Sequence, residues 1–423
     1  MIPSFLFGPN SGRCGAPPDG RSVRWILAAV VAFACALASA APARAGWNAP
    51  IAISARGEIG PVRLAVDARG DAIAVWSRVT RPWNARRPDQ GYAVEAAFRG
   101  AGGAWQPPVV VGAAVQLCPR GTCGWPVPSL AIGPRGAAVI AWANFTTSGA
   151  GVIRAASRAA DGRWQRPVAV YRGGATWLQV ALDQLGNATA IWSPGGPRGA
   201  IRVAFQPAGK QWRKPPTIGS GFGVQLAFDA KGNAIALWTH LISDRRGALE
   251  QAAFKPARGS WSQPVTIGRG GGGGYLPQLA VDPRGDAIAV WADWVRPGVC
   301  CGSAVQAASK PAGGLWRTPV TIASGFVGSV QVGLDARGDA LAIWDLARGD
   351  VQAAMASPQG SWQRPISLGA GAPPQLRGVA GEVDAALDSQ GNAVAVWIHD
   401  LGTSHDPDHA ESLVQAATFT RAG

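Results

Sequence analysis

Histidine and aspartate residues gather in one segment near the C-terminus, residues 399–409. The segment holds three of the four histidines of the chain together with three aspartates. Imidazole and carboxylate groups together suit a transition metal. The alternative is a solvated polar loop, because no helix is expected to align the histidines. If a divalent metal binds, we expect its ligands to be His399, His405, Asp406, Asp408 and His409. No other cofactor is predicted.

Four cysteines follow residue 45, in two close pairs. Cys118 and Cys123 flank four residues and are predicted to form a disulfide. Cys300 and Cys301 are adjacent, so they form either a strained local disulfide or two free thiols. A zinc site made by all four is disfavoured, because the second pair lacks the usual two-residue spacer.

Paired carboxylates would allow glycoside hydrolysis. A glycosidase needs two carboxyl groups about 5–10 Å apart. The candidates are Glu58, Asp293, Glu382 and Asp384, and nothing in their spacing singles out a pair. The chain also shows no nucleophile–base pair. We therefore predict no catalytic residue.

An internal repeat determines which elements must position these groups. Its first core is Asp-x-x-Gly-Asp/Asn-Ala-x-Ala-x-Trp, and one of its seven copies has lost the acids. The seven copies end at Trp76, Trp142, Trp192, Trp238, Trp291, Trp344 and Trp397. A second core, Trp-x-x-Pro followed by alternating Val and Ile, starts at Trp47, Trp105, Trp164, Trp212, Trp261, Trp316 and Trp362. Fourteen of the 19 tryptophans are thus repeat residues, which makes them mainly a structural signature.

Each repeat is predicted to form four short strands. In one copy these are residues 279–281, 287–291, 305–308 and 316–322. The repeat Asp is expected to cap the turn between the first two strands, with Gly at positive φ. Four-stranded units of roughly 50 residues repeated in a ring are typical of a β-propeller.

The two ends of the repeat region are complementary. The region starts with an isolated fourth strand at residues 47–53 and ends with three strands that finish at 414–419. We predict that these segments form one blade and so close the ring without open edges. The expected fold is all-β: a seven-bladed propeller of four antiparallel strands per blade, in a single domain over residues 46–423.

The repeat resembles those of secreted bacterial β-propellers grouped with NHL-type and sialidase-like repeats. The turn Asp-x-x-Gly-Asn followed by an apolar strand is similar to the NHL repeat, which lacks these tryptophans. The sialidase Asp-box has a Ser and a spacing that are absent here. The resemblance covers nearly all of residues 46–423 at the level of the fold, and it transfers no catalytic residue.

Candidate binding residues fall on the face that carries the long, variable loops, where binding residues usually lie. An aromatic residue precedes the first strand in five repeats, at Trp125, Trp177, Phe222, Tyr275 and Phe326. These rings could stack on sugars or peptides, or pack between neighbouring blades. A polar residue also stands four positions before the repeat Asp, at Arg63, Ser129, Gln179, Gln225, Gln278, Gln331 and Asp384. This polar collar could bind a ligand or form hydrogen bonds between blades.

The N-terminal segment has the pattern of an export signal. Arg21 and Arg24 precede an apolar stretch, and Ala43-Arg44-Ala45 is a small-x-small cleavage site. We expect residues 1–45 to be a signal peptide, with translation from near residue 23 as an alternative start. The protein is then secreted or associated with the cell envelope, without a later transmembrane segment.

The chain carries a formal charge of +14. A basic surface can recruit anionic partners. However, the arginines form no run of the kind that nucleic acid requires, and arginine-rich codon usage is the favoured explanation of the charge. We expect an exported, monomeric, non-catalytic propeller that binds a glycan, cell-wall polymer or protein. The alternatives are a glycoside hydrolase or lyase acting in the channel, and a structural surface module.

Overall fold

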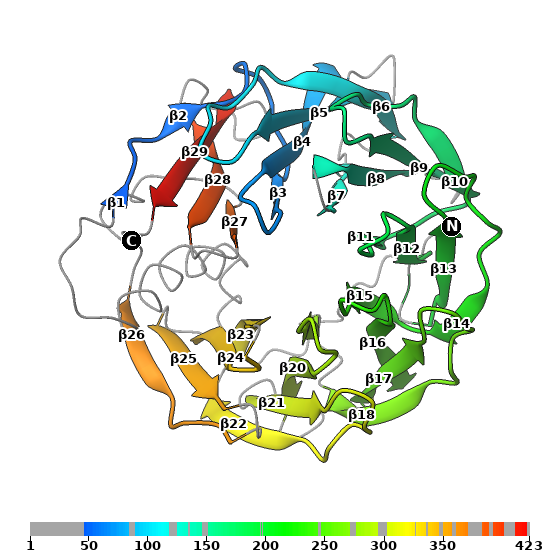
Figure 1. Ribbon diagram of the computed structural model, residues 1–423, viewed down its shortest axis with the longest axis vertical. Helices are drawn as coiled ribbons and strands as arrows, with labels where there is room; N and C mark the ends of the chain where they lie inside the picture. Colours follow the sequence, from blue (N-terminus) through cyan, green and yellow to red (C-terminus); the bar gives the residue numbers. More distant parts are fainter. Residues whose placement is uncertain are drawn as a thin grey trace, which may run out of the picture.

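The structure is a computed structural model, and its strands lie around a ring (Figure 1). It describes residues 46–83, 89–117, 125–133, 136–145, 151–194, 196, 198–243, 247–270, 276–294, 303–325, 327–335, 337–346, 350–357, 361–370, 383–388, 392–401 and 411–420. All regular elements in these ranges are β-strands. They form seven antiparallel, blade-like sheets. No helix that is long and apolar enough to cross a membrane occurs in the described ranges.

Sheets 1 to 3 follow one another along the chain. Within each, the first strand lies nearest the centre of the ring and the fourth lies at the rim (Figure 1). Sheet 1 is β3 (Arg63–Val66), β4 (Ala72–Arg81), β5 (Asp89–Arg99) and β6 (Val109–Leu117). Sheet 2 is β7 (Ser129–Ile132), β8 (Ala138–Phe145), β9 (Gly151–Arg158) and β10 (Val168–Arg172). Sheet 3 is β11 (Trp177–Leu182), β12 (Ala188–Ser193), β13 (Ala200–Gln206) and β14 (Thr217–Ser220).

Sheets 4 to 6 repeat this order. Sheet 4 is β15 (Phe222–Phe228), β16 (Ala234–Ser243), β17 (Gly247–Lys255) and β18 (Val265–Gly270). Sheet 5 is β19 (Gln278–Val281), β20 (Ala287–Trp294), β21 (Ser303–Lys310) and β22 (Val320–Gly325). Sheet 6 is β23 (Val327–Leu334), β24 (Ala340–Leu346), β25 (Asp350–Ala356) and β26 (Ile366–Ala370).

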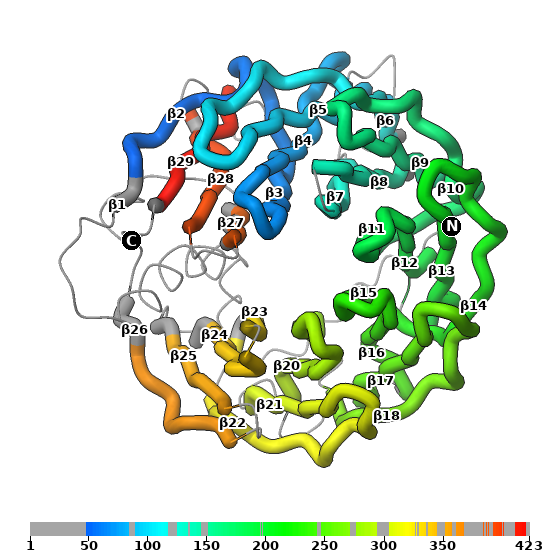
Figure 2. Tube along the Cα trace, viewed as in Figure 1, coloured from blue at the N-terminus to red at the C-terminus, as the bar shows by residue number. Residues whose placement is uncertain are grey.

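Sheet 7 combines the two ends of the described chain. Its strands β27 (Val383–Leu387), β28 (Ala393–Asp400) and β29 (Ser412–Thr420) come from the C-terminal end. The short strands β1 (Gly46–Trp47) and β2 (Ile51–Ala52) both pair antiparallel with β29. Figure 2 shows the red β29 beside the blue β2, so the path of the chain around the ring brings its two ends together.

In sheets 1 to 6 the fourth strand starts later than predicted. In the copy at residues 316–322, β22 begins only at Val320, directly after Pro319. Proline has no N–H to donate to a ladder, so the residues before it lie outside the strand. Isolated bridges instead pair Trp105, Trp164 and Trp362 with the ends of β5, β9 and β25.

The repeat Asp caps its turn as expected. In sheet 1, Asp67 Oδ1 accepts hydrogen bonds from the N–H groups of Arg69 and Asp71 at 2.9 and 3.0 Å. Gly70 follows with a φ of 90°, a region that residues with a side chain rarely adopt. Asp71 Oδ1 in turn accepts from Ala101 N–H at 2.9 Å. The second acid of the repeat thus ties the first turn of a sheet to the turn between its third and fourth strands.

The core lies between neighbouring sheets and is centred on the repeat tryptophans. Their side chains are fully buried, and several press on a glycine in the fourth strand of the preceding sheet. A Cβ atom on Gly112 would lie 2.5 Å from Trp142, and one on Gly268 would lie 2.3 Å from Trp291. Since such a distance is well inside van der Waals contact, the glycine is what lets the two sheets approach so closely.

Candidate ligand-binding site

The polar collar mainly joins neighbouring sheets. Ser129 Oγ in β7 accepts the N–H of Val180 in β11 at 2.9 Å. Gln179 Oε1 in β11 accepts the N–H of Leu226 in β15 at 2.6 Å. Asp384 Oδ2 in β27 accepts the N–H of Leu64 in β3 at 3.0 Å. Each of these three residues thereby satisfies an N–H at the open inner edge of the next sheet.

The remaining collar residues lie at the same position of their inner strands. Arg63 donates from Nη1 to the carbonyl of Val62 at 2.9 Å. Gln225, Gln278 and Gln331 are half-buried in β15, β19 and β23. The contacts of Ser129, Gln179 and Asp384 therefore match the second interpretation of the collar, a hydrogen-bonded ring between sheets.

The described aromatic candidates also contact neighbouring groups. Trp125 meets the ring of Tyr92 edge-on, with centroids 5.3 Å apart and planes at 61°. Its other side lies on the backbone of Gly60, where a Cβ would come within 2.2 Å of the indole. Trp177 of sheet 3 packs against Phe222 of sheet 4 with centroids 5.3 Å apart. Burial raises the pKa of Tyr92 to about 12, with a further contribution from the charge of Glu58, so its hydroxyl keeps its proton at neutral pH.

Several predicted site residues lie outside the described residues. They are Cys118, Cys123, Tyr275, Cys300, Cys301, Phe326, Glu382, His405, Asp406, Asp408 and His409, together with the signal segment 1–45. His399 is described: it is half-buried in β28 and pairs in register with Leu413. The metal-site and disulfide hypotheses stay predictions.

Two buried acids were not singled out from the sequence. Glu95 accepts the indole N–H of Trp76 at 3.0 Å and the Nε–H of Arg78 at 2.9 Å. Glu250 accepts the hydroxyl of Thr239 at 2.9 Å, and burial, with a smaller effect of the charge of Asp293, raises its pKa to about 8. An acid with such a pKa could donate a proton. However, Glu250 is only 1% exposed, and the described structure therefore leaves no room for a polymeric substrate at its carboxyl group.

A groove of about 880 Å³ lies between sheets 2 and 3, at the end that carries the short turns. Its walls are the end of β9 with the turn to β10, the turn between β11 and β12, and the turn between β13 and β14. Most of the lining is alanine, glycine and glutamine. The exposed polar residues of the lining are Gln165, Arg166, Gln184, Lys210 and Gln211. No Asp or Glu is found among the described residues that line it.

The walls of the groove are held by hydrogen bonds. Gln206 Nε2 donates to the carbonyl of Lys210 at 2.9 Å, which braces the turn between β13 and β14. Asp183 Oδ1 accepts the N–H groups of Leu185 and Asn187, each at 2.9 Å, in the turn between β11 and β12. Fixed walls reduce the ordering that a ligand must impose. The exposed amides can donate to and accept from hydroxyl groups.

The joint between sheets 2 and 3 also departs from the repeat. Where sheets 1, 3 and 4 have Gly112, Gly219 and Gly268, sheet 2 has Tyr171. Its ring packs against Trp192 with centroids 5.2 Å apart. A glycine allows the next tryptophan to rest on the backbone, whereas a tyrosine must be accommodated between the sheets. The sequence contained this signal, but it emerges only when the fourth strands are aligned.

Comparisons with known proteins support the architecture. Neither the family models nor the curated proteins include a match to this chain. Among solved structures, a PL25 ulvan lyase bound to -[GlcA(1-4)Rha3S]- aligns with a TM-score of 0.52 and 10% identity, over 86% of this chain and 96% of that one. The polysaccharide lyase Uly1 aligns with a TM-score of 0.51 and 11% identity, over 91% of this chain and 95% of that one. The fold is thus of the β-propeller type.

Proposed function

We propose that the protein is an exported, non-catalytic β-propeller that binds a glycan. The observation that carries the proposal is the braced, amide-rich groove between sheets 2 and 3, which exposes Gln165, Gln184 and Gln211. A volume of about 880 Å³ is ample for several sugar units, since drug-sized ligands occupy pockets of about 300–1,000 Å³. The two aligned lyases, both acting on polysaccharides by their names, agree with a glycan as the partner.

The proposed groove lies at the short-turn end, whereas the sequence favoured the opposite, long-loop end. Glycan, wall-polymer or protein binding at the long-loop end stays a prediction, because many of its candidate residues are outside the described ranges. Catalysis is the competing function. The buried glutamates Glu95 and Glu250 belong to hydrogen-bonded networks between strands and do not line the groove.

The test is a binding and turnover assay with the mature chain, residues 46–423, on a panel of neutral and acidic polysaccharides. We expect binding without release of new reducing ends or unsaturated products. Gln165→Ala should weaken binding, and Gln363→Ala is the matched control, because Gln363 occupies the same exposed repeat position in sheet 6. Turnover of any polysaccharide, or absence of binding to the whole panel, would overturn the proposal.

Export is tested separately. We expect the protein recovered from the culture medium or cell envelope to begin at Gly46 when its N-terminus is sequenced. An intact residue 1 would contradict the proposal of a cleaved signal peptide.

A further inference from the structure

Sheets 2 and 3 carry most of the net positive charge of residues 46–423. Residues 129–220 hold eleven Lys and Arg against two Asp and Glu, a net charge of +9. All other residues from 46 to 423 add only +2. Both acids take part in turns: Asp183 caps the turn between β11 and β12, and Asp161 accepts the N–H of Arg163 at 3.0 Å. Codon usage alone would spread the charge over all seven repeats, so it does not explain this concentration.

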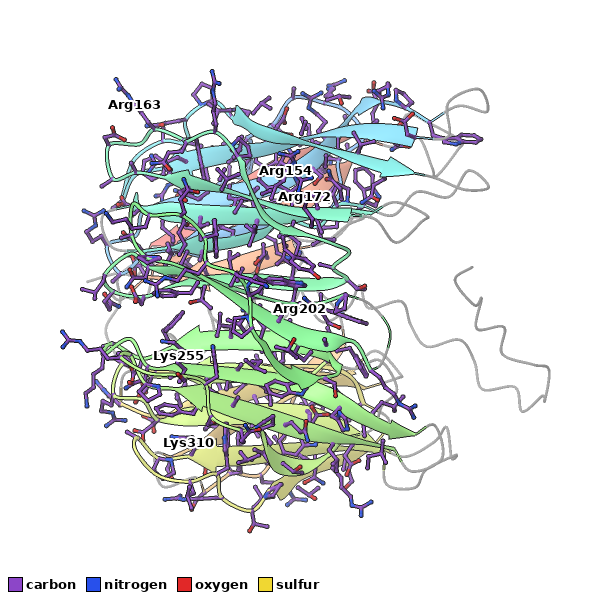
Figure 3. The ribbon with its side chains drawn as sticks, turned by 90° about the vertical axis from the view of Figure 1, so that its right-hand side faces the viewer. Arg154, Arg163, Arg172, Arg202, Lys255 and Lys310 are labelled. Atoms are coloured by element: carbon purple, nitrogen blue, oxygen red, sulfur yellow. The ribbon has the colours of Figure 1, made fainter. Side chains whose placement is uncertain are left out.

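Seven of the eleven cations belong to the outer flank, which we define as strands β9, β10 and β13 with the turns at 159–166 and 207–211. Figure 3 shows Arg154, Arg163, Arg172 and Arg202 on this side of the molecule. The flank includes the groove, with Arg166 and Lys210 exposed in its lining. The groove is therefore lined by both amides and cations.

Arginine replaces glutamine at two repeat positions of this flank. In sheets 6 and 7, the residue paired with the repeat tryptophan is glutamine, and its Oε1 accepts the indole N–H of Trp344 or Trp397 at 3.2 or 3.0 Å. In sheets 2 and 3 the paired residues are Arg154 and Arg202. An arginine cannot accept a hydrogen bond, so both tryptophans lose this acceptor.

The two sheets differ in how they compensate for the loss. In sheet 2 the indole of Trp142 donates instead to the carbonyl of Ala113 at 3.2 Å. In sheet 3 neither the Trp192 indole N–H nor Arg202 Nε–H has a hydrogen-bond partner among the described residues, although both atoms are buried. The Arg202 guanidinium lies over the ring of Tyr171, 5.0 Å from its centroid. The Trp238 indole N–H of sheet 4 also has no partner among the described residues, although Trp238 is paired with Gln251, so the feature that sets sheet 3 apart is the added cation.

We propose that the outer flank binds an acidic polysaccharide, through the carboxylate or sulfate groups of its sugars. This inference rests on the proposed glycan function and names the class of glycan. Arg166 and Lys210 hold anionic groups along the groove, and the exposed Arg163 and Arg172 attract others on the flank. Gln165, Gln184 and Gln211 pair with sugar hydroxyls. A nucleic acid fits less well, because no aromatic side chain lines the described groove for bases to stack on.

The ligand panel separates the charge of the glycan from glycan binding itself. Binding of the mature chain is measured by titration calorimetry with heparin, polygalacturonate, dextran and duplex DNA. We expect heparin and polygalacturonate to bind, dextran not to bind, and affinity to fall as salt rises. If dextran binds as well as the acidic polymers, the proposed glycan function stands and this inference falls. If no glycan binds, both fall, and if DNA binds more tightly than either acidic polymer, the proposed ligand class is wrong.

Two variants locate the site. Arg202→Gln introduces the glutamine that sheets 4 to 7 carry at this position, so the fold should be as stable as before. Its affinity for heparin should nevertheless fall about threefold, because one cation of the flank is lost. Arg166→Gln should weaken binding about threefold, as expected for an exposed cation. The control is Arg364→Gln, which changes the equivalent exposed residue of sheet 6 and should leave binding unchanged. If both flank variants bind heparin as the wild type does, or if the control loses as much affinity, the site does not lie on the outer flank.

Discussion

The stability of the protein should depend on the protonation of Glu250. Its carboxyl group is buried between sheets 4 and 5, where burial raises the pKa from 4.5 to about 8. The neighbouring backbone leaves little space, since a Cβ on Gly270 would lie 2.0 Å from Glu250 Oε1. The folded protein therefore holds a proton on Glu250 at neutral pH, whereas the unfolded chain has released it.

The sign and size of the effect follow from these two pKa values. Below pH 4.5 both states hold the proton, and Glu250 costs no stability through ionisation. Between pH 4.5 and about 8 only the folded state holds it, so the free energy of unfolding falls as the pH rises. Each pKa unit corresponds to about 1.4 kcal/mol, which makes the total loss about 5 kcal/mol once the pH is well above 8.

The assay compares the wild type with Glu250→Gln, which keeps a neutral side chain of the same size at every pH. Urea unfolding is followed by tryptophan fluorescence at pH 5, 6.5 and 8. Other titrating groups affect both proteins equally, so the difference between them isolates Glu250. We expect the free energy of unfolding of the variant, relative to that of the wild type, to rise by about 2–4 kcal/mol between pH 5 and pH 8. The control Glu411→Gln removes an exposed acid and should show no such trend. A difference that stays constant with pH, or that favours the wild type at pH 8, would refute the reasoning.

Three further predictions concern how the ring is held together. We infer that pairing of β1 and β2 with β29 closes the ring, so deletion of residues 46–55 should lower the melting temperature of the whole protein; an unchanged melting curve would contradict this. Gly268→Ala should cost about 1–3 kcal/mol in urea unfolding because of overpacking against Trp291, whereas Gly333→Ala, where a Cβ meets nothing within 4 Å, should not. Asp384→Ala removes the acceptor for Leu64 N–H and should cost about 1–3 kcal/mol, and equal stability of variant and wild type would argue against a structural collar.

The blade-like sheets could be predicted because their signals are local and repeated. Asp67 and Gly70 lie within one five-residue turn, and each copy of this pattern predicts the same turn. The repeat tryptophans mark the second strands in the same way. The start of the fourth strands was predicted less well, because the loss of an N–H at Pro319 outweighs the aromatic character of the residues before it.

The candidate site was harder to predict, since its residues act through partners far away in the chain. Gln179 is visibly polar in the sequence, but its partner, Leu226 N–H, belongs to the next sheet. The arginines look scattered along the chain, and only the ring shows that sheets 2 and 3 bring many of them onto one flank. Arg202 and Tyr171 carry a readable signal, which is their departure from the repeat. It becomes visible only when the third and fourth strands of all the sheets are aligned.

The contact between a repeat tryptophan and the preceding glycine has a consequence for how such a ring can evolve. Sheet 4 holds both halves of a joint in one repeat unit: Trp238 fits Gly219 of the unit before it, and Gly268 receives Trp291 of the unit after it. A duplicated unit is therefore compatible with its neighbours from the start. Selection can then alter a single joint, as Tyr171 and Arg202 alter the one between sheets 2 and 3, while the other joints preserve the ring.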